Sequence, residues 1–496
     1  MQPRARQGTI ITPATLSCPA PDRRSLLRLL RSAPLLLALG ALLAAAATHS
    51  GSALASRGGA RPRYAREYSP SEIVVGYSPR QRGLRAGTAR VFDTARLQGA
   101  TTRTGLMQVQ RGASVATALR RARSERGVRW AVPDYVAHIA GAPAGEFIPD
   151  DRGMGKAPGD WRELQWNFVG QYGVQAPQAW ANLIHDGRGG GRGVIVAVLD
   201  TGVAYANRGH YHRSPDFGAF QFVKGYDFIG HDPRPYDHNG HGTFVAATIA
   251  EQTNNGYGLT GLAYGVRIMP VRVLNAQGEG EASTIAQGVY YAVRHHAQVI
   301  NLSLEFSPGV TASDIPELLH ALRYAYRHGV LVVAAAGNEG HRTLAYPSRA
   351  PDVISVGAST EHGCLASYSN DGTGLTLVAP GGGTDADLPN DPECHPDLPP
   401  GRDVYQVTLT GDGPRRFGIP PGYEGTSMAT PHVAATAALV IASGVLGPHP
   451  TPAQITARLR ATARRMGGGG DEALYGAGLL DAAAATAPGG PGALAG

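Results

Sequence analysis

Ser427 is the residue in this 496-residue chain whose surroundings best suit a nucleophile. It lies in the stretch Gly425–Pro431, which runs directly into a long apolar segment. Because glycine permits a sharp turn and proline is tolerated at the start of a helix, the stretch predicts that Ser427 begins a buried helix. The unpaired amides and the dipole of a helix start favour the negative charge that an attacking serine creates. A serine at this place is also an ordinary helix cap, so Ser427 alone does not decide between the two interpretations.

An acid and a base precede Ser427, and each is expected at the end of an element. Asp200 follows the apolar run Val194–Leu199, and His241 stands between two glycines ahead of an apolar helix. Taken singly, Asp200 could cap a turn, and His241 could bind a metal with His238, although zinc would need a third ligand. In the order Asp, His, Ser, they form a nucleophilic triad: the base takes the proton of the serine, and the carboxylate fixes the tautomer of the base.

Nucleophilic attack of this kind also needs a hydrogen-bond donor for the oxyanion that forms. Asn338 lies in the small-residue segment Ala334–Gly340, just after an apolar run. Its side-chain amide can donate to the oxyanion alongside the backbone N–H of Ser427.

The elements that must hold these residues alternate between buried strands and helices. Continuous apolar runs are typical of strands covered on both faces, so we predict a doubly wound α/β domain over 161–488, with a mostly parallel sheet and helices on both faces. Such sheets place active sites beyond the carboxyl ends of their strands. The further runs are Ile268–Leu274, Val299–Leu304, Val330–Ala336 and Val353–Val356, and the helical patterns are Thr284–His296 and Ile315–His328.

The N-terminal part has a different organisation. Arginines precede the apolar run Ala33–Ala47, and Ala53–Ala55 supplies a small-x-small cleavage site, so 1–55 is predicted to be a signal peptide. The run is shorter than the roughly 20 residues that span a bilayer, which argues against a permanent membrane anchor. We expect a small α+β unit within 56–140, a loop-like linker and processing region at 141–160, and a flexible tail at 489–496.

Charge is distributed unevenly along the chain. Residues 1–140 hold 22 Lys or Arg and 6 Asp or Glu, a net charge of +16, whereas the remaining residues hold 23 and 32, a net charge of −9. A nucleic-acid-binding protein would keep its basic residues on the folded domain that binds, so the overall net charge of +7 is poor evidence for that function.

The motifs Asp200–Gly202, Gly240–Thr243, Ala335–Gly340 and Gly425–Pro431 together resemble those of the subtilisin family of secreted serine proteases. The resemblance runs from about Trp166 to Ala485, and residues 72–138 are similar, more weakly, to the inhibitory propeptide of the family. It implies a secreted, monomeric endopeptidase that acts on proteins or peptides, needs no catalytic cofactor, and is inhibited by its own propeptide until matured. The implied residues are the triad Asp200, His241 and Ser427, the oxyanion residue Asn338, the substrate-pairing residues Ser303 and Leu304, and the P1-pocket wall Ala335, Ala336 and Gly337.

One departure from the family lies beside the expected substrate cleft. The family usually has glycine after the Ser-Leu pair, whereas Glu305 and Phe306 follow here. Bulky side chains at this place would narrow the cleft or add a charge preference.

The sequence also suggests two loops that could bind calcium and one pair of cysteines that could form a disulfide. Asp227 and Asp232 lie in a loop that resembles a calcium loop of heat-stable relatives, and Asp385 and Asp387 lie in a second oxygen-rich loop, for which a solvated acidic loop is the alternative. Of the three cysteines, Cys18 falls in the signal peptide. In an oxidising compartment Cys364 and Cys394 would pair, and two free buried thiols are the alternative.

Other features of the sequence raise two alternative functions. The stretch Gly187–Gly191 is glycine-rich, but it precedes its strand, whereas a dinucleotide-binding loop must follow the strand and open a helix. A secreted, non-catalytic binding protein on a protease fold is the stronger alternative, because a fold does not by itself give a function.

Overall fold

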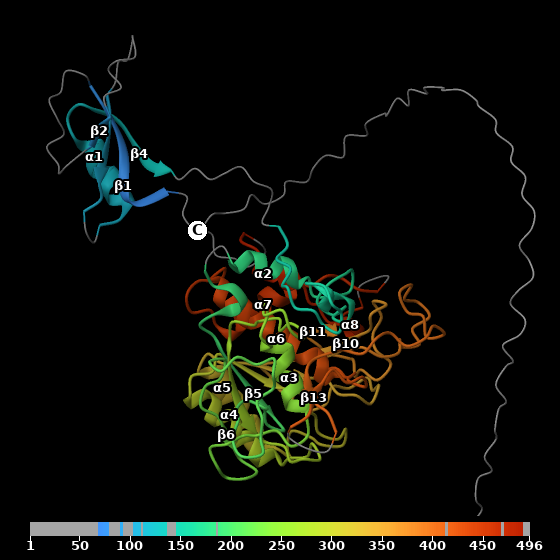
Figure 1. The fold of residues 1–496 in the computed structure, drawn as a ribbon. Coiled ribbons are helices and arrows are strands. Elements are labelled where there is room, and N and C mark those ends of the chain that lie inside the picture. Colours follow the sequence, from blue (N-terminus) through green and yellow to red (C-terminus); the bar gives the residue numbers. More distant parts are fainter. Residues whose placement is uncertain are drawn as a thin grey trace, which may run out of the picture. The chain divides into compact units, whose positions relative to one another are not determined.

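The computed structural model describes residues 68–78, 90–92, 103–110, 113–135, 145–184, 187–411, 415–467 and 471–489. The expected signal peptide at 1–55 and the tail from 490 lie outside these residues. The described residues form a small N-terminal sheet with one helix and a larger α/β part, and each is described by itself (Figure 1). Within the described residues, no helix combines the length and apolar character needed to cross a membrane.

The small N-terminal part is an antiparallel sheet of order β2-β3-β1-β4 with one helix. The α+β unit expected from the sequence is therefore present. Its core is formed by Ile73, Val75, Met107, Ala122 and Ala131. The elements are β1 (Tyr68–Tyr77), β2 (Arg90–Phe92), β3 (Arg103–Gln108), α1 (Val115–Ser124) and β4 (Val128–Tyr135).

The larger part is built on a seven-stranded sheet of order β11-β10-β9-β8-β5-β7-β6, in which every described strand pair is parallel. The order places β5 between β8 and β7, so both of its neighbours come later in the chain. The strands are β5 (Ile195–Asp200), β6 (Tyr226–Asp227), β7 (Arg267–Arg272), β8 (Val299–Leu302), β9 (Leu331–Ala335), β10 (Val353–Ser359) and β11 (Leu377–Pro380).

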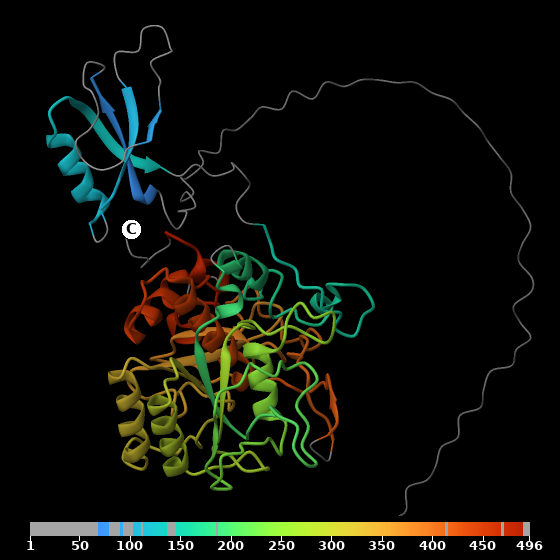
Figure 2. The ribbon, with the colours of Figure 1, turned by 60° about the vertical axis from the view of Figure 1, so that its left-hand side comes forward.

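Helices cover both faces of this sheet, as the continuous apolar runs predicted. Since successive side chains of a strand point to opposite faces, Val196 and Val198 of β5 pack into one core, while Ala197 and Leu199 pack into another. Figure 2 shows the strands lying between α4 and α5 on one side and α3 on the other. The main helices are α2 (Ala176–Ile184), α3 (His241–Ala250), α4 (Ala282–Arg294), α5 (Pro316–Arg327), α6 (Thr426–Ser443) and α7 (Pro452–Thr462).

Shorter elements complete the larger part. They are η2 (Asp160–Glu163), η3 (Gly189–Gly191), α8 (Glu472–Tyr475), α9 (Ala482–Thr486) and the small hairpin of β12 (Thr408–Leu409) and β13 (Phe417–Gly418).

Helix α6 begins where the sequence predicted, but Pro431 lies in its second turn. A proline there has no N–H for the carbonyl four residues earlier, which is that of Ser427. The hydroxyl of Ser303 donates to this carbonyl instead, at 2.8 Å. The helix therefore continues through Pro431 because a residue from the end of a neighbouring strand replaces the missing bond.

Part of the segment expected as a linker is bound to the α/β part. The backbone N–H of Phe147 donates to the carbonyl of Pro177 at 3.1 Å, and Asp151 is fully buried. The carboxylate of Asp151 accepts from the backbone N–H groups of Asn254 and Asn255. From Phe147 onward the chain is thus part of the larger folded unit rather than a free connection.

The structure joins Cys364 and Cys394 by a disulfide, with 30 residues of sequence separation. Cys364 is fully buried. The disulfide predicted from the cysteine count is therefore present.

We predict that this disulfide stabilises the larger part by about 3–4 kcal/mol, because a closed loop of this length lowers the entropy of the unfolded chain. Replacing both cysteines by alanine in a Ser427→Ala background, which prevents self-digestion, should lower the free energy of unfolding by about that amount. Mass spectrometry of parent protein alkylated without reduction provides the direct check. Two alkylated thiols on secreted material would contradict the prediction.

Candidate active site

Asp200 and His241 are in direct contact. Asp200 is the last residue of β5 and is fully buried, and His241 is the first residue of α3 with a side chain 25% exposed. The imidazole Nδ1 lies 2.8 Å from Asp200 Oδ1. Burial alone would lower the pKa of His241, but the charge and hydrogen bond of Asp200, together with the charge of Asp237, raise it above the ordinary value. The contact leaves Nε2 of the ring available to take a proton.

Asp237 holds the start of α3 in place, and sequence reasoning did not identify it. This buried carboxylate accepts from the backbone N–H groups of Asn239, Gly240 and Thr243 and from the hydroxyl of Thr201. An acidic residue a few positions before a glycine-flanked helix start is the signal that could have revealed this capping role.

Gly242 is required for the approach of α3 to β5. A Cβ at this position would lie 2.1 Å from the carbonyl oxygen of Gly202 and 3.1 Å from the side chain of Asp200. The small residue therefore lets His241 come within hydrogen-bonding distance of the carboxylate.

Ser427 is the second residue of α6, and its hydroxyl donates to the backbone carbonyl of Ser303 at 3.3 Å. The described hydrogen bond of Ser427 is thus not to His241. In structures without substrate, hydrogen bonds between a nucleophile and its base are often long or misaligned. Ser303 follows β8, the parallel neighbour of β5, so Ser427 is held at the same sheet edge as Asp200.

Asn338 lies beyond the end of β9 and is anchored to the start of α6. Its side-chain oxygen accepts from the backbone N–H of Thr426 at 2.8 Å and from the Thr426 hydroxyl at 3.0 Å. Its Nδ2 donates to Glu305 Oε1 at 3.0 Å, and its backbone N–H donates to Glu305 Oε2 at 2.9 Å. The orientation of the amide is therefore fixed from two sides, by Thr426 and by Glu305.

The residues expected to line the substrate cleft lie close to Asn338 in the chain or beyond the neighbouring strand β8. Ala335 and Ala336 are buried at the end of β9, and Gly337 has a φ of 114°, a backbone conformation that favours glycine. Ser303 and Leu304 continue beyond β8 without strand pairing in the described sheet.

The carboxylates expected to bind calcium have protein partners. Asp227 forms an ion pair with Arg272 at 2.9 Å, and Asp232 pairs with Arg234 at 3.3 Å. Asp385 accepts from Thr360 and contacts His362, whereas Asp387 is exposed. Among the described residues, no group of three or more Asp, Glu, His or Cys side chains is placed to hold a metal ion.

A different set of acids is buried without a cationic partner among the ion pairs of the described residues. Asp151, Asp216 and Glu251 are each fully buried, and both carboxylate oxygens of Glu251 lack a hydrogen-bond partner. Burial, opposed by hydrogen bonds from Asn255 and Leu259, raises the pKa of Asp216 to about 8. Burial and then the charge of Asp216 raise the pKa of Glu251 well above its usual range. Sequence reasoning missed this set because its members are far apart in the chain.

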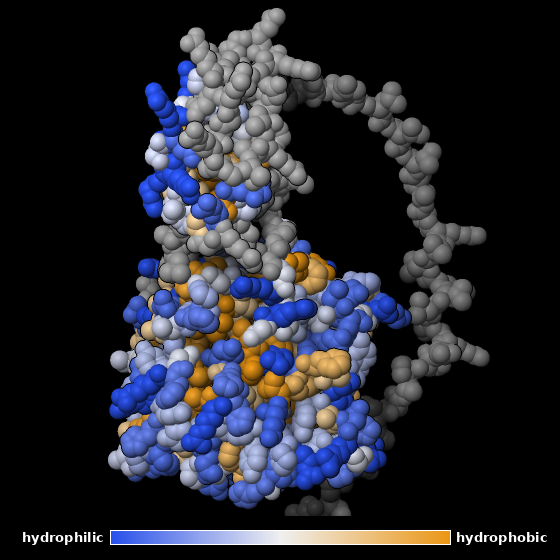
Figure 3. All heavy atoms as spheres, turned by 90° about the vertical axis from the view of Figure 1, so that its left-hand side faces the viewer, coloured by the Kyte–Doolittle hydropathy of each residue, from blue (hydrophilic) through white to orange (hydrophobic). Residues whose placement is uncertain are grey.

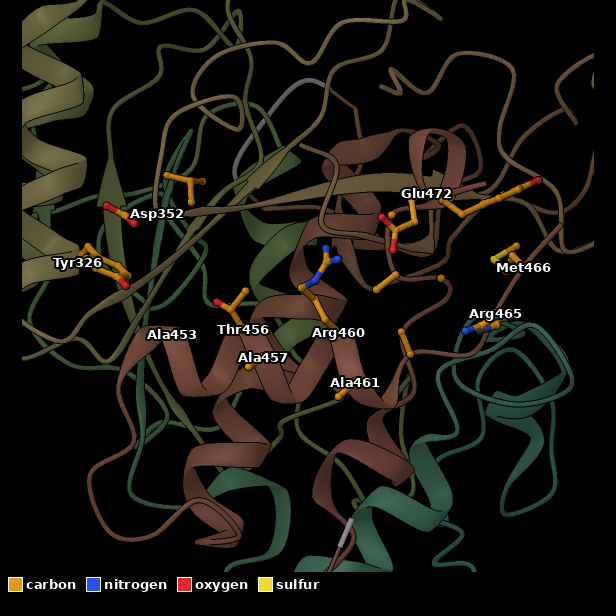
Figure 4. A pocket seen from close by; sticks show the side chains of 16 residues that line it. Tyr326, Asp352, Ala453, Thr456, Ala457, Arg460, Ala461, Arg465, Met466 and Glu472 are labelled. Atoms are coloured by element: carbon orange, nitrogen blue, oxygen red, sulfur yellow. The ribbon is translucent and has the colours of Figure 1, made fainter. Parts of the chain in front are cut away.

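The surface of the larger part has two further features. Hydrophobic residues gather near the middle of one face of the larger part, within a hydrophilic surround (Figure 3). A hollow of about 890 Å³ is lined mainly by α7, α8 and the segments beside them, and the side chains of Arg460 and Glu472 lie along it (Figure 4). None of the residues that line this hollow belongs to the candidate catalytic set.

Comparison with known proteins identifies the family to which the chain belongs. Residues 191–478 match the model of the subtilase family of peptidases. Subtilisin Savinase from Lederbergia lenta is 38% identical over 313 residues, which cover 63% of this chain and 96% of that protein. A thermophilic serine proteinase from Bacillus sp. (strain AK1) is 38% identical over 274 residues, which span 55% of this chain and 58% of that protein.

A solved structure agrees with the sequence matches. A structure of proteases from Pseudoalteromonas arctica PAMC 21717 superposes with a TM-score of 0.55 and 31% identity, and it covers 68% of this chain and 99% of that chain. The doubly wound α/β fold is thereby shown, and so is the class of reaction. The chain belongs to the subtilase family and is a serine endopeptidase.

Proposed function

We propose that the protein is a secreted endopeptidase that cleaves proteins or peptides through an acyl-enzyme intermediate on Ser427. The observation that carries the proposal is the buried Asp200–His241 hydrogen bond at the sheet edge where Ser427 begins α6. The reaction as proposed uses only side chains and backbone groups of the chain itself.

In the proposed mechanism, Ser427 Oγ attacks the carbonyl carbon of the scissile bond while its proton passes to Nε2 of His241. Asp200 holds the ring through Nδ1 and stabilises the imidazolium that forms. The oxyanion of the tetrahedral intermediate accepts from Asn338 Nδ2 and the Ser427 backbone N–H. His241 then gives the proton to the leaving amine, and water hydrolyses the acyl-enzyme by the same steps.

The competing proposal is a secreted binding protein without activity. Hydrolysis of casein by the mature protein, abolished by a covalent serine-directed inhibitor, separates the two. Casein left intact after removal of residues 56–140 would favour the binding function.

The proposal includes maturation by removal of the N-terminal part. Residues 57–140 hold 16 Arg and 5 Asp or Glu, whereas residues 141–496 carry a net charge of −9. Opposite charges favour association of the propeptide with the enzyme. The propeptide residues near the cleavage site would then occupy the active site and inhibit the enzyme. Because the chain is bound to the larger part from Phe147 onward, we place the first cut between His138 and Phe147.

The proposal also includes a structural calcium ion. The surroundings of Glu251 suit such an ion better than the loops first expected, because Glu251 has two buried oxygens without donors and lies beside Asp216. Since no three acidic side chains are arranged as ligands in the described residues, backbone carbonyl oxygens would complete the site. Calcium prefers carboxylate and carbonyl oxygens, and it would supply the positive charge that these buried carboxylates lack.

Asn338→Ala should lower kcat by about 10²–10³-fold, as loss of the equivalent donor does in a subtilisin. It should fold with a lower melting temperature, because Thr426 and Glu305 each lose a hydrogen-bond partner. KM should change little, because the oxyanion exists only in the transition state and the intermediate. Steady-state kinetics on one peptide, with thermal unfolding as the control for folding, measures both effects. An unchanged kcat would remove Asn338 from the mechanism.

Ser427→Ala should accumulate as the uncut proenzyme in a host without other secreted proteases. The physical reason is that the first cut requires the nucleophile of the same molecule. Intact mass compares the mutant with the parent, and addition of active parent should then release the mature mass. Efficient processing of the mutant by itself would contradict self-cleavage.

The stability of the Ser427→Ala protein in a chelator should fall as pH rises from 5 to about 8. A carboxyl whose pKa is raised in the folded state favours folding while protonated, so its contribution is full below the ordinary carboxyl pKa and is lost as pH passes the folded value of about 8. Millimolar calcium should raise the melting temperature more at pH 8 than at pH 5.

Glu251→Gln and Asp387→Asn are the matched variants for this experiment. The first should reduce the calcium-dependent rise in melting temperature, and the second, at an exposed position, should retain it. The reverse pattern would place the ion in the loop of Asp387, and the absence of any calcium effect would refute the structural ion.

A further inference from the structure

Glu305 stands where the family usually has glycine, and its carboxylate lies against the candidate oxyanion residue. Both oxygens accept from Asn338, one from the backbone N–H and one from Nδ2. A Cβ on the neighbouring Gly337 would lie 2.7 Å from Glu305 Oε2. The carboxylate is thus packed along the Gly337–Asn338 backbone.

No cation balances this charge within the part of the chain that the structure describes. The described ion pairs include neither Glu305 nor its neighbour Glu339, and Glu339 accepts from Asn370 instead. Burial first, and then the charge of Glu339, raise the pKa of Glu305. A half-buried carboxylate beside a second one is a site where a positive charge would be stabilised.

The position of the scissile bond brings a substrate side chain to this carboxylate. In the proposed mechanism the substrate carbonyl oxygen binds at Asn338, so the residue that supplies this carbonyl, called P1, lies beside Gly337 and Asn338. Its side chain branches from the carbon next to that carbonyl. A long P1 side chain can therefore reach the carboxylate that contacts Asn338 directly.

The charge also matters for the reaction itself. A carboxylate 3.0 Å from Asn338 Nδ2 accepts one of the two amide N–H groups, and its negative charge repels the oxyanion that would accept the other. A cationic side chain would draw the carboxylate into an ion pair and offset that repulsion. Arginine suits the site best, because its planar guanidinium can bond to both carboxylate oxygens at once.

Resting on the proposed function, we infer that Glu305 is a specificity residue that selects substrates with Arg or Lys at P1. In the free enzyme the carboxylate of Glu305 accepts hydrogen bonds from Asn338. When a substrate binds, the cationic P1 side chain forms an ion pair with this carboxylate instead. The segment proposed for the first self-cut, 139–146, contains no Arg or Lys. That step does not need the contact, because an intramolecular reaction has a high effective concentration.

The test measures kcat/KM of the mature enzyme on three peptides that differ only at P1, with Arg, Lys or Leu. The parent should prefer Arg over Leu by roughly 10- to 100-fold, as expected for hydrogen bonds to a charged group. Glu305→Gln should reduce this ratio to within a fewfold of one, and Glu339→Gln, the matched loss of a neighbouring charge, should largely retain it.

Three results would overturn the inference. The first is a parent that cleaves the Leu peptide as well as the Arg peptide, a result that does not depend on the folding of any variant. The second is a Glu305→Gln variant that loses activity on all three peptides equally, which would make Glu305 a positioning residue for Asn338 alone. The third is a preserved ratio in that variant. If the parent cleaved none of the peptides and left casein intact, the proposed function itself would fail, which is a separate outcome.

Discussion

The position of the nucleophile depends on which group donates a hydrogen bond to the backbone carbonyl of Ser427. Pro431 removes the helical hydrogen bond that the carbonyl of Ser427 would accept, and an unpaired buried carbonyl costs about 1–3 kcal/mol. The hydroxyl of Ser303 supplies the replacement, and the hydroxyl of Ser427 donates in return to the carbonyl of Ser303. This reciprocal pair ties the start of α6 to the end of β8 and so fixes the nucleophile at the sheet edge.

The other catalytic elements are fixed to the same edge by buried carboxylates. Asp200 ends β5 and holds the ring of His241, while Asp237 binds the amides at the start of α3 and, through Thr201, the end of β5. Two negative charges close to one imidazole favour its protonated form, the form that must appear when the serine loses its proton. Packing and charge therefore act together, since the contacts that position the helix also stabilise the intermediate state of the base.

The sequence predicted what depends on local pattern. Apolar runs marked the strands of the parallel sheet, because a strand covered on both faces carries mainly apolar residues on both sides. The chain order of Asp200, His241 and Ser427 indicated the chemistry. The sequence did not predict contacts between distant residues. The hydrogen bond from Thr201 to Asp237 and the hydrogen bonds between Glu305 and Asn338 depend on which strand ends become neighbours.

The position of Pro431 also could not be interpreted correctly from local sequence alone. The local rule that proline belongs in the first turn is correct for an isolated helix, but here a tertiary hydrogen bond from Ser303 permits it one turn later. The set Asp151, Asp216 and Glu251 was likewise invisible in the sequence, since single acidic residues are ordinarily exposed and only the fold buries these together.

The central claim is that His241, held by Asp200, activates Ser427. Covalent labelling of the mature protein with a fluorophosphonate, followed by peptide mapping, tests it most directly, because the reagent reacts with a serine whose proton is taken by a base. The account predicts a single adduct on Ser427 and its loss in His241→Ala, with the fold of the variant checked by thermal unfolding. An adduct on another residue, no adduct at all, or equal labelling of Ser427 without His241 would contradict the account.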